Sequence, residues 1–295
     1  MAGTGTEALH DMAKGLDERP LVEVASLLAE GQIAAAASVR DALDDIVGGA
    51  KAMANSLNAG GTLHYVAAGS SGLMAAADAQ ELGGTYSISP DNLRIHMAGG
   101  LPTGVEMPGA TEDDTAGLAE DLSDLTSRDT IIAVSASGTT PYTLAAVRIA
   151  KERGAAIVAI ANNANAPLLE GADHAICLAT PPELVSGSTR MGAGTAQKIA
   201  LNMLSTLMAV ELGHVHDGMM VNLHADNIKL RGRAAGIVSE IARVDTAKAA
   251  DALDAANGRV KPAVLVAAGD VSASDANGIL RETEGNLRAA LARLT

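Results

Sequence analysis

Five short apolar runs between residues 63 and 179 constrain the fold more than any other feature. Glycine-rich or polar turns bound each run, and stretches with helical periodicity lie between several of them. Such alternation is typical of parallel strands that are buried on both faces. We therefore expect an α/β fold with a doubly wound, mostly parallel sheet flanked by helices. The predicted strands are Leu63–Ala68, Leu93–Ala98, Thr130–Ser135, Ala156–Ala161 and His174–Ala179, and the predicted helices between them are 73–82, 114–125 and 141–153.

Helical patterns also occupy the chain on both sides of this region. Residues 21–58 carry apolar residues at helical spacing, and the pair Gly60-Gly61 ends that stretch. A long helix is predicted at about 194–212 and another at 226–245, and short helical patterns separated by turns follow. The predicted division is an N-terminal helical arm and layer (1–58), an α/β domain (59–245) and a small C-terminal helical module (246–295).

The composition limits both the core and the partners. The chain has 295 residues with no Phe, no Trp and three Tyr, while 48% of its residues are hydrophobic. Small aliphatic side chains and methionine must therefore fill the core, which lets helices and strands approach closely. The net charge of −14 argues against nucleic acid and membrane partners, and the single cysteine excludes an intramolecular disulfide. The N-terminus shows no secretory signal pattern, so we expect a cytoplasmic protein.

Two predicted strand ends carry the same loop chemistry. Residues 66–72, Val-Ala-Ala-Gly-Ser-Ser-Gly, and residues 134–140, Val-Ser-Ala-Ser-Gly-Thr-Thr, each lead from a strand through a Ser/Gly loop into a helix. Backbone N–H groups and hydroxyls at a helix N-terminus can bind a phosphate group. Hydroxyls can do so without a positively charged side chain. One such loop is more often an ordinary helix cap, but two at neighbouring strand ends favour binding. Neither loop has the G-x-G-x-x-G spacing of a dinucleotide site.

A third loop and two carboxylates complete the predicted site. Residues 186–195, Ser-Gly-Ser-Thr-Arg-Met-Gly-Ala-Gly-Thr, are rich in hydroxyls and glycine, which favours a ligand loop over a plain connector. Glu81 lies one helix beyond the first loop, and Glu112 opens an acidic triplet. Each carboxylate alone is more often a solvated group or a helix cap. As a pair near one site, one can act as general acid and the other as general base, because different environments give them different pKa values.

The sequence predicts no metal site. Three histidines are close together in the chain: His214, His216 and His224. No cysteine or carboxylate frame accompanies them, and their spacing is not that of H-E-x-x-H.

At these residues the chain resembles the N-acetylmuramic acid 6-phosphate etherase family. The matching segments are colinear over nearly the whole chain, and the most specific is residues 187–198, Gly-Ser-Thr-Arg-Met-Gly-Ala-Gly-Thr-Ala-Gln-Lys. The other matching segments are 69–72, 77–81, 97–100, 112–114, 136–142, 202–206, 225–230 and 284–291. The resemblance implies a SIS-type (sugar isomerase), flavodoxin-like domain, a homodimer with sites near the interface, and a reaction without cofactor. The glucokinase regulatory protein shares this architecture as a sensor.

The resemblance also implies a reaction. In the family the sugar opens to its aldehyde, a glutamate removes the proton at C2, and the C3 ether leaves as D-lactate. Water then adds, which gives N-acetylglucosamine 6-phosphate. Glu81 matches the family's proton donor and Glu112 its second catalytic glutamate, while Glu183 matches a glutamate expected to hold a sugar hydroxyl or assist ring opening. The phosphate and sugar loops match at Ser70, Ser71, Ser137, Thr140, Ser188 and Thr189.

The chain departs from the family pattern around the expected site. Leu73 and Thr139 stand where the family usually has arginine, and Gly192 stands where it has lysine. Loss of arginine removes a planar, bidentate donor, which bears on recognition of the lactyl carboxylate and leaves the ether substituent open. Two other functions stay open: a phosphosugar isomerase that uses the same glutamates, and a non-catalytic sugar-phosphate-binding regulator.

Overall fold

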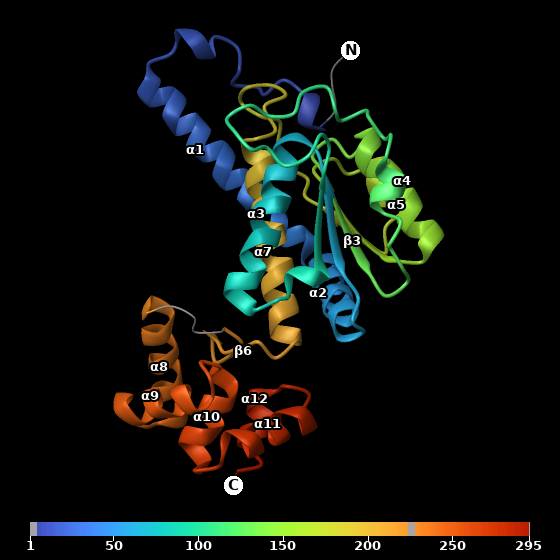
Figure 1. Cartoon of the computed structure of the whole chain (residues 1–295). Coiled ribbons are helices and arrows are strands. Elements are labelled where there is room, and N and C mark those ends of the chain that lie inside the picture. Colours follow the sequence, from blue (N-terminus) through green and yellow to red (C-terminus); the bar gives the residue numbers. More distant parts are fainter. Residues whose placement is uncertain (1–4, 224–227, 295) are drawn as a thin grey trace. The chain divides into compact units, whose positions relative to one another are not determined.

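A five-stranded parallel sheet forms the core of the α/β unit in the computed structural model, which describes residues 5–223 and 228–294 (Figure 1). The strands are β1 (Leu63–Ala67), β2 (Leu93–Met97), β3 (Thr130–Ser135), β4 (Ala156–Ala161) and β5 (His174–Cys177). Their spatial order is β2-β1-β3-β4-β5, and all neighbours pair in parallel. The predicted strands and the doubly wound parallel sheet are therefore confirmed. The strand order reverses between β1 and β3, which is where open α/β sheets bind ligands.

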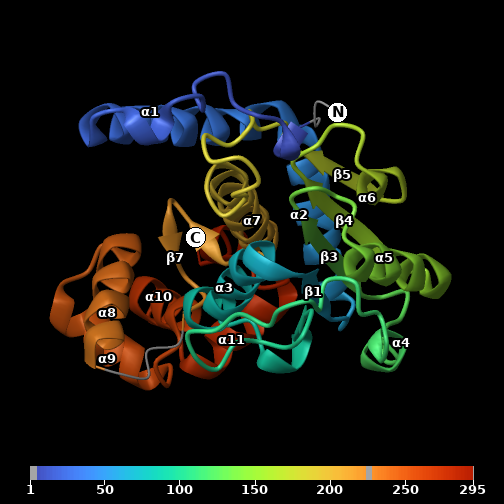
Figure 2. The ribbon, with the colours of Figure 1, turned by 90° about the horizontal axis from the view of Figure 1, so that it is seen from above.

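Helices cover both faces of this sheet. The helix α2 (Leu43–Asn58) packs on one face, and α5 (Pro141–Arg153) with the short α6 (Pro167–Glu170) packs on the other (Figure 2). β1 and β3 are consequently buried along their whole length, which explains why their sequences are mostly apolar, with His64 as a buried polar residue of β1. Small residues allow the close approach expected from the composition. A Cβ added to Gly49 of α2 would lie 3.1 Å from Val158 of β4.

The N-terminal helix α1 (Leu21–Ala37) is largely exposed. It leads through a 3-10 turn (Ser38–Ala42) into α2. Leu21, Val22 and Ile33 have exposed fractions of 85%, 79% and 70%, so the helix presents large apolar side chains to its surroundings. By length and composition alone, Leu21–Asn58 is apolar enough to cross a membrane, with a mean hydropathy of 1.3 in its best window. The sequence had led us to expect no spanning stretch. Core helices of soluble proteins pass the same test, so the expectation of a protein without a membrane partner stays a prediction.

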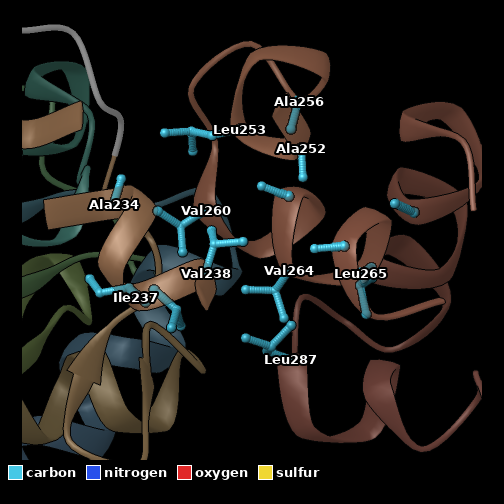
Figure 3. Packing of buried hydrophobic residues seen from close by; sticks show 14 of the residues in the cluster. Ala234, Ile237, Val238, Ala252, Leu253, Ala256, Val260, Val264, Leu265 and Leu287 are labelled. Atoms are coloured by element: carbon cyan, nitrogen blue, oxygen red, sulfur yellow. The ribbon is translucent and has the colours of Figure 1, made fainter. Parts of the chain in front are cut away.

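The chain divides into two compact units: residues 1–80 with 90–207, and residues 81–89 with 208–295. The second unit is a small, mainly helical module. Its core brings together buried residues such as Val238, Leu253, Val264 and Leu287 (Figure 3). Its elements are a short hairpin of β6 (Val215–His216) and β7 (Met219–Met220), then α8 (Ile228–Ala242), α9 (Thr246–Ala255), α10 (Val260–Gly269), α11 (Ala273–Glu282) and α12 (Leu287–Leu291).

Three predicted helices have different limits in the structure. The predicted helix 73–82 is longer, because α3 (Gly69–Tyr86) already begins within the first serine loop. The prediction of a helix over 114–125 was wrong in extent. Only α4 (Leu118–Asp121) is helical there, and it begins after Gly117, whose φ of +82° does not continue a helix. The helix predicted to begin at residue 226 is described from Ile228, and residues 226 and 227 lie outside the described part of the chain.

Candidate functional site

The first two serine loops lie next to each other at the carboxyl edge of the sheet. Ala67 of β1 and Val134 of β3 are partners in the parallel register, so both loops leave the sheet at the same level. Because α3 begins at Gly69, Ser70 and Ser71 lie in its first turn. The N–H groups of a first turn have no acceptor within the helix and attract anions. The structure thus brings both loops to the point where the strand order reverses.

The second loop is held by its own hydroxyls. Ser135 Oγ accepts a hydrogen bond from the Gly138 N–H at 3.0 Å and lies 2.8 Å from Thr140 Oγ1. Ser137 Oγ accepts from the N–H and the hydroxyl of Thr139, at 3.2 and 2.9 Å. Gly138 is required at the turn, because its φ is +69° and an added Cβ would lie 2.3 Å from Ala166. This network fixes the loop before any ligand binds. The role of Ser135 in holding the loop was not predicted from the sequence.

Glu112 lies against the first loop. A Cβ added to Gly69 would be 2.9 Å from Glu112 Oε1, which places the carboxylate beside the N-terminus of α3. The Tyr142 N–H, at the start of α5, donates to the Glu112 carbonyl oxygen at 3.1 Å. The side chain is exposed and has no ion-pair partner in the described part of the chain. The structure therefore brings Glu112 together with both serine loops.

Glu81 lies further along α3. It follows Ser70 by eleven residues of one continuous helix, which corresponds to about 16 Å at the usual rise per residue. Its side chain is exposed. The serine loops and Glu112 are thus grouped at one end of α3, and Glu81 belongs to a later part of the same helix.

The third loop is anchored by Glu183. This buried carboxylate accepts hydrogen bonds from the N–H groups of Gly192 and Ala193, at 3.0 and 2.8 Å. It caps α7 (Gly192–Glu211) and neutralises the positive end of that helix. In the ranges that the structure describes, the hydroxyls of Ser188 and Thr189 have no hydrogen-bond partner, so they are available to a ligand.

Two residues that sequence reasoning missed connect the third loop to the sheet edge. Asn162 follows β4 directly, and its N–H donates to the carbonyl oxygen of Ala136 at 3.0 Å. Gln197 Nε2, on α7, donates to Asn162 Oδ1 at 2.8 Å. Gln197 Oε1 is buried and has no partner within the described residues. An asparagine placed directly after a predicted buried strand is the signal that could have identified this site residue.

A buried carboxylate fixes the orientation of α3. Tyr65 donates its hydroxyl hydrogen to Asp78 Oδ2 at 3.0 Å, and Asn202 Nδ2 and Ser205 Oγ donate to Asp78 Oδ1 at 2.7 and 2.8 Å. Burial, together with the charge of Asp78, raises the pKa of Tyr65 well above its usual value. Asp78 precedes Glu81 by three residues, so this network also sets the direction in which Glu81 leaves the helix.

No group of three metal-ligating side chains occurs among the described residues. Burial lowers the pKa of both His214 and His216, which keeps them neutral. His224 lies outside the described residues.

Comparison with known proteins agrees with the family resemblance found in the sequence. A SIS domain model matches residues 107–212. The N-acetylmuramic acid 6-phosphate etherase of Streptomyces avermitilis is 39% identical, with 97% of this chain and 93% of that protein covered. N-acetylmuramic acid 6-phosphate etherase 1 of Enterococcus faecalis is 35% identical, with 99% and 98% covered. A solved structure of a proposed phosphosugar isomerase from Bacteroides fragilis shares the fold, with a TM-score of 0.53 at 16% identity over 68% of this chain and 95% of that one. The chain therefore belongs to the N-acetylmuramic acid 6-phosphate etherase family.

Proposed function

We propose that this protein is a lyase that cleaves the C3 ether of N-acetylmuramic acid 6-phosphate or a closely related amino-sugar 6-phosphate. The products are N-acetylglucosamine 6-phosphate and D-lactate. The observation that carries the proposal is Glu112, which lies beside two hydroxyl loops at the sheet edge in a chain that matches etherases over nearly its full length. The reaction serves recycling of peptidoglycan sugars in the cytoplasm and needs no cofactor.

The phosphate binds at the N-terminus of α3. Ser70 and Ser71 offer first-turn N–H groups, and their hydroxyls have no hydrogen-bond partner in the described ranges. Ser137 and Thr140 lie on the neighbouring loop, and Ser188 and Thr189 extend the same chemistry toward the sugar. Hydrogen bonds to a phosphate dianion are charge-assisted, so hydroxyls and N–H groups hold it without a lysine or arginine. Glu183 shapes this loop by capping α7, and a hydrogen bond to a sugar hydroxyl would use its remaining lone pairs.

The two glutamates divide the proton transfers. In the open-chain sugar, the aldehyde acidifies the C2 proton, which Glu112 removes as the C3–O bond breaks. Glu81 donates a proton to the departing ether oxygen, and D-lactate leaves. Water then adds its oxygen at C3 of the unsaturated aldehyde, and C2 takes up a proton, which restores the saturated sugar.

The position of Glu81 supports a site shared between two subunits. About 16 Å of α3 separates the backbone of Glu81 from that of Ser70, and Glu112 lies at the Ser70 end of this helix. We infer that Glu81 of one protomer works beside Glu112 of its partner in a homodimer. The exposed apolar residues of α1 support such an assembly, because large apolar side chains are normally covered. Light scattering should give twice the chain mass of 29.6 kDa; a monomer, or recovery in detergent or vesicle fractions alone, would contradict it.

A product assay tests the reaction. Purified protein should release D-lactate from N-acetylmuramic acid 6-phosphate, and a panel of sugar 6-phosphates with other C3 ethers would define the substituent. Glu81→Gln and Glu112→Gln should each lower turnover by ~10²-fold or more while binding is retained. Glu152→Gln, on the exposed surface of α5, is the matched control and should be as active as the wild type.

Other outcomes of the same assay would replace the proposal. Deuterium uptake at C2 without release of a fragment indicates an isomerase. Tight binding without turnover, unchanged by Glu112→Gln, indicates a regulator. Leu73→Arg and Thr139→Arg restore the usual family residues, and a gain in D-lactate release from either would show that the lost cations shape recognition of the carboxylate.

A further inference from the structure

The C-terminal unit contains a pocket of about 900 Å³ that the ether cleavage does not use. The N-terminus of α10, the helix α11 and the turn before α12 line it, together with the segment after β7. None of the residues assigned to the sugar-phosphate site lines it. Arg259, Lys261 and Arg281 supply three cations, and Glu284 supplies one carboxylate. The charged lining thus has an excess of two positive charges in a chain with a net charge of −14.

The two arginines of this pocket are not engaged in ion pairs. Within the described residues, no carboxylate lies within salt-bridge distance of Arg259 or Arg281. Four other cations of the same unit have carboxylate partners: Arg231 with Asp254, Lys248 with Asp270, Arg288 with Asp217 and Arg293 with Glu282. Arg233 and Arg243, outside the pocket, also have none within the described residues. The guanidinium groups at the pocket therefore keep all their donors for another acceptor.

Lys261 brings a buried charge to the same wall. Its exposed fraction is 7%, and its Nζ donates to the carbonyl oxygen of Gly285 at 2.8 Å. This bond joins α10 to the turn before α12, and it uses one of the three ammonium hydrogens. Burial lowers the pKa of Lys261 to about 8. His214, whose pKa is lowered by burial and next by Lys261, has a buried Nδ1 without a partner in the described ranges.

The helix α10 adds backbone donors. It is ten residues long. The side chain of its N-cap residue, Arg259, accepts no hydrogen bond from the first turn. Arg259, Val260, Lys261 and Pro262 all line the pocket, so the positive end of the helix faces it. Val260 and Lys261 supply the N–H groups of this turn, because Pro262 has none. An anion there would meet the helix end, two arginines and the buried ammonium together.

We propose that this pocket binds the phosphate group of a small phosphorylated metabolite. The excess of two positive charges complements a phosphate dianion. Val221, Leu223 and Leu280 line the remaining wall and suit an organic portion, and Ser274 and Asn277 offer polar contacts to it. The volume lies within the usual range for small-molecule sites. A purely structural role for Lys261 would explain its bond to Gly285 and would leave the two unpaired arginines without a function.

Hydrogen–deuterium exchange of the full-length protein tests for binding at this pocket, because it measures protection of the peptides that line it. Inorganic phosphate should slow exchange in peptides that cover residues 257–263 and 277–287. N-acetylglucosamine 6-phosphate should do so at lower concentration if the pocket takes an organic phosphate, and neutral N-acetylglucosamine should have no effect. The double variant Arg259→Gln/Arg281→Gln should weaken this protection at least ~10-fold, because it removes two charge-assisted contacts. Arg233→Gln, an exposed position of α8 outside the pocket, is the matched control.

Three results would overturn phosphate binding at this pocket: no protection of these peptides in the wild type, full protection in the double variant, or equal protection by chloride at the same ionic strength. Both arginines are exposed, so the variants should fold, and the single variant Arg281→Gln provides a second, milder test. Protection by inorganic phosphate that no sugar phosphate exceeds would contradict the organic ligand. Loss of D-lactate release with retained protection would count against the proposed reaction alone.

Discussion

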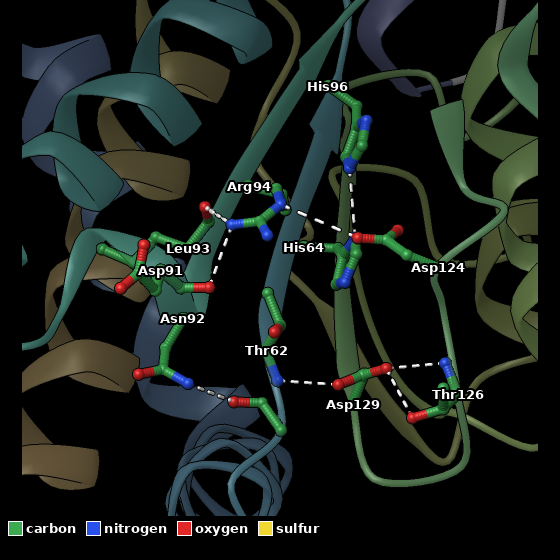
Figure 4. A network of polar contacts seen from close by, with 11 residues as sticks. Thr62, His64, Asp91, Asn92, Leu93, Arg94, His96, Asp124, Thr126 and Asp129 are labelled. Carbon is green, nitrogen blue, oxygen red and sulfur yellow. Dashed lines mark hydrogen bonds and ion pairs between the residues drawn. The ribbon is translucent and has the colours of Figure 1, made fainter. Parts of the chain in front are cut away.

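Acidification should destabilise the sheet through a pair of stacked histidines. His64 of β1 and His96 of β2 have parallel rings with centroids 5.3 Å apart, and His64 Nδ1 lies 3.1 Å from His96 Nε2 (Figure 4). One of these two nitrogens must accept the hydrogen bond, so both rings cannot be protonated. Burial, and next the charge of His64, lowers the pKa of His96 to about 4, although Asp121 and Asp124 oppose the shift. Burial lowers the pKa of His64 in the same direction.

The sign and size of the effect follow from the difference between folded and unfolded chains. An unfolded histidine has a pKa of about 6.5, so between pH 6.5 and 4 the unfolded chain binds the proton more readily. The free energy of unfolding is therefore highest above pH 6.5 and falls as the pH drops toward 4. The shift of His96 corresponds to about 3 kcal/mol at most, and its partial exposure reduces this to about 2 kcal/mol.

Urea unfolding followed by circular dichroism, measured from pH 7 to pH 4.5, gives the slope. His96→Gln should flatten the decline by about 2 kcal/mol over this range. Histidine ring signals in an NMR titration give the pKa of His96 directly. A value near 6.5, or equal slopes for the wild type and His96→Gln, would refute this reasoning.

Further substitutions test the loops and the core. Gly138→Ala should destabilise the protein by about 2 kcal/mol or more, since the new Cβ would lie 2.3 Å from Ala166; an unchanged melting temperature would contradict this. Glu183→Ala leaves two first-turn N–H groups of α7 without an acceptor and should lower the free energy of unfolding by about 1–3 kcal/mol in urea titrations. Ile132→Ala, fully buried in β3, should lower it by about 2–4 kcal/mol, whereas the more exposed Leu73→Ala should change it by less than about 1 kcal/mol; similar losses for both would show that burial is not the cause.

The strands were predictable because their signal is local. Each strand is a short, mostly apolar run bounded by glycine or polar residues, and burial of β1 and β3 on both faces favours such a run. The helix at 114–125 was predicted too long because Thr115, Ala116 and Gly117 continue the apolar and polar pattern without forming a helix. The limits of the three predicted domains, at 58/59 and 245/246, stay a prediction.

The site was predictable only in part, because much of it depends on contacts between distant residues. The hydroxyl loops follow strands and could be recognised from their sequence, and the register of β1 with β3 places them together. The bonds of Asp78 to Ser205, 127 residues away, and of Gln197 to Asn162, 35 residues away, have no local signal. The catalytic and binding roles of the predicted site residues stay predictions, which the variants above test.

A heterodimer of Glu81→Gln and Glu112→Gln chains tests the shared site most directly. The two chains, with different purification tags, are expressed together, and the mixed dimer is isolated and assayed for D-lactate release. If each site takes one glutamate from each protomer, the mixed dimer has one intact site and should regain about half of the wild-type rate. If both glutamates act from the same chain, every site lacks one of them, and the rate would stay ~10²-fold below the wild type.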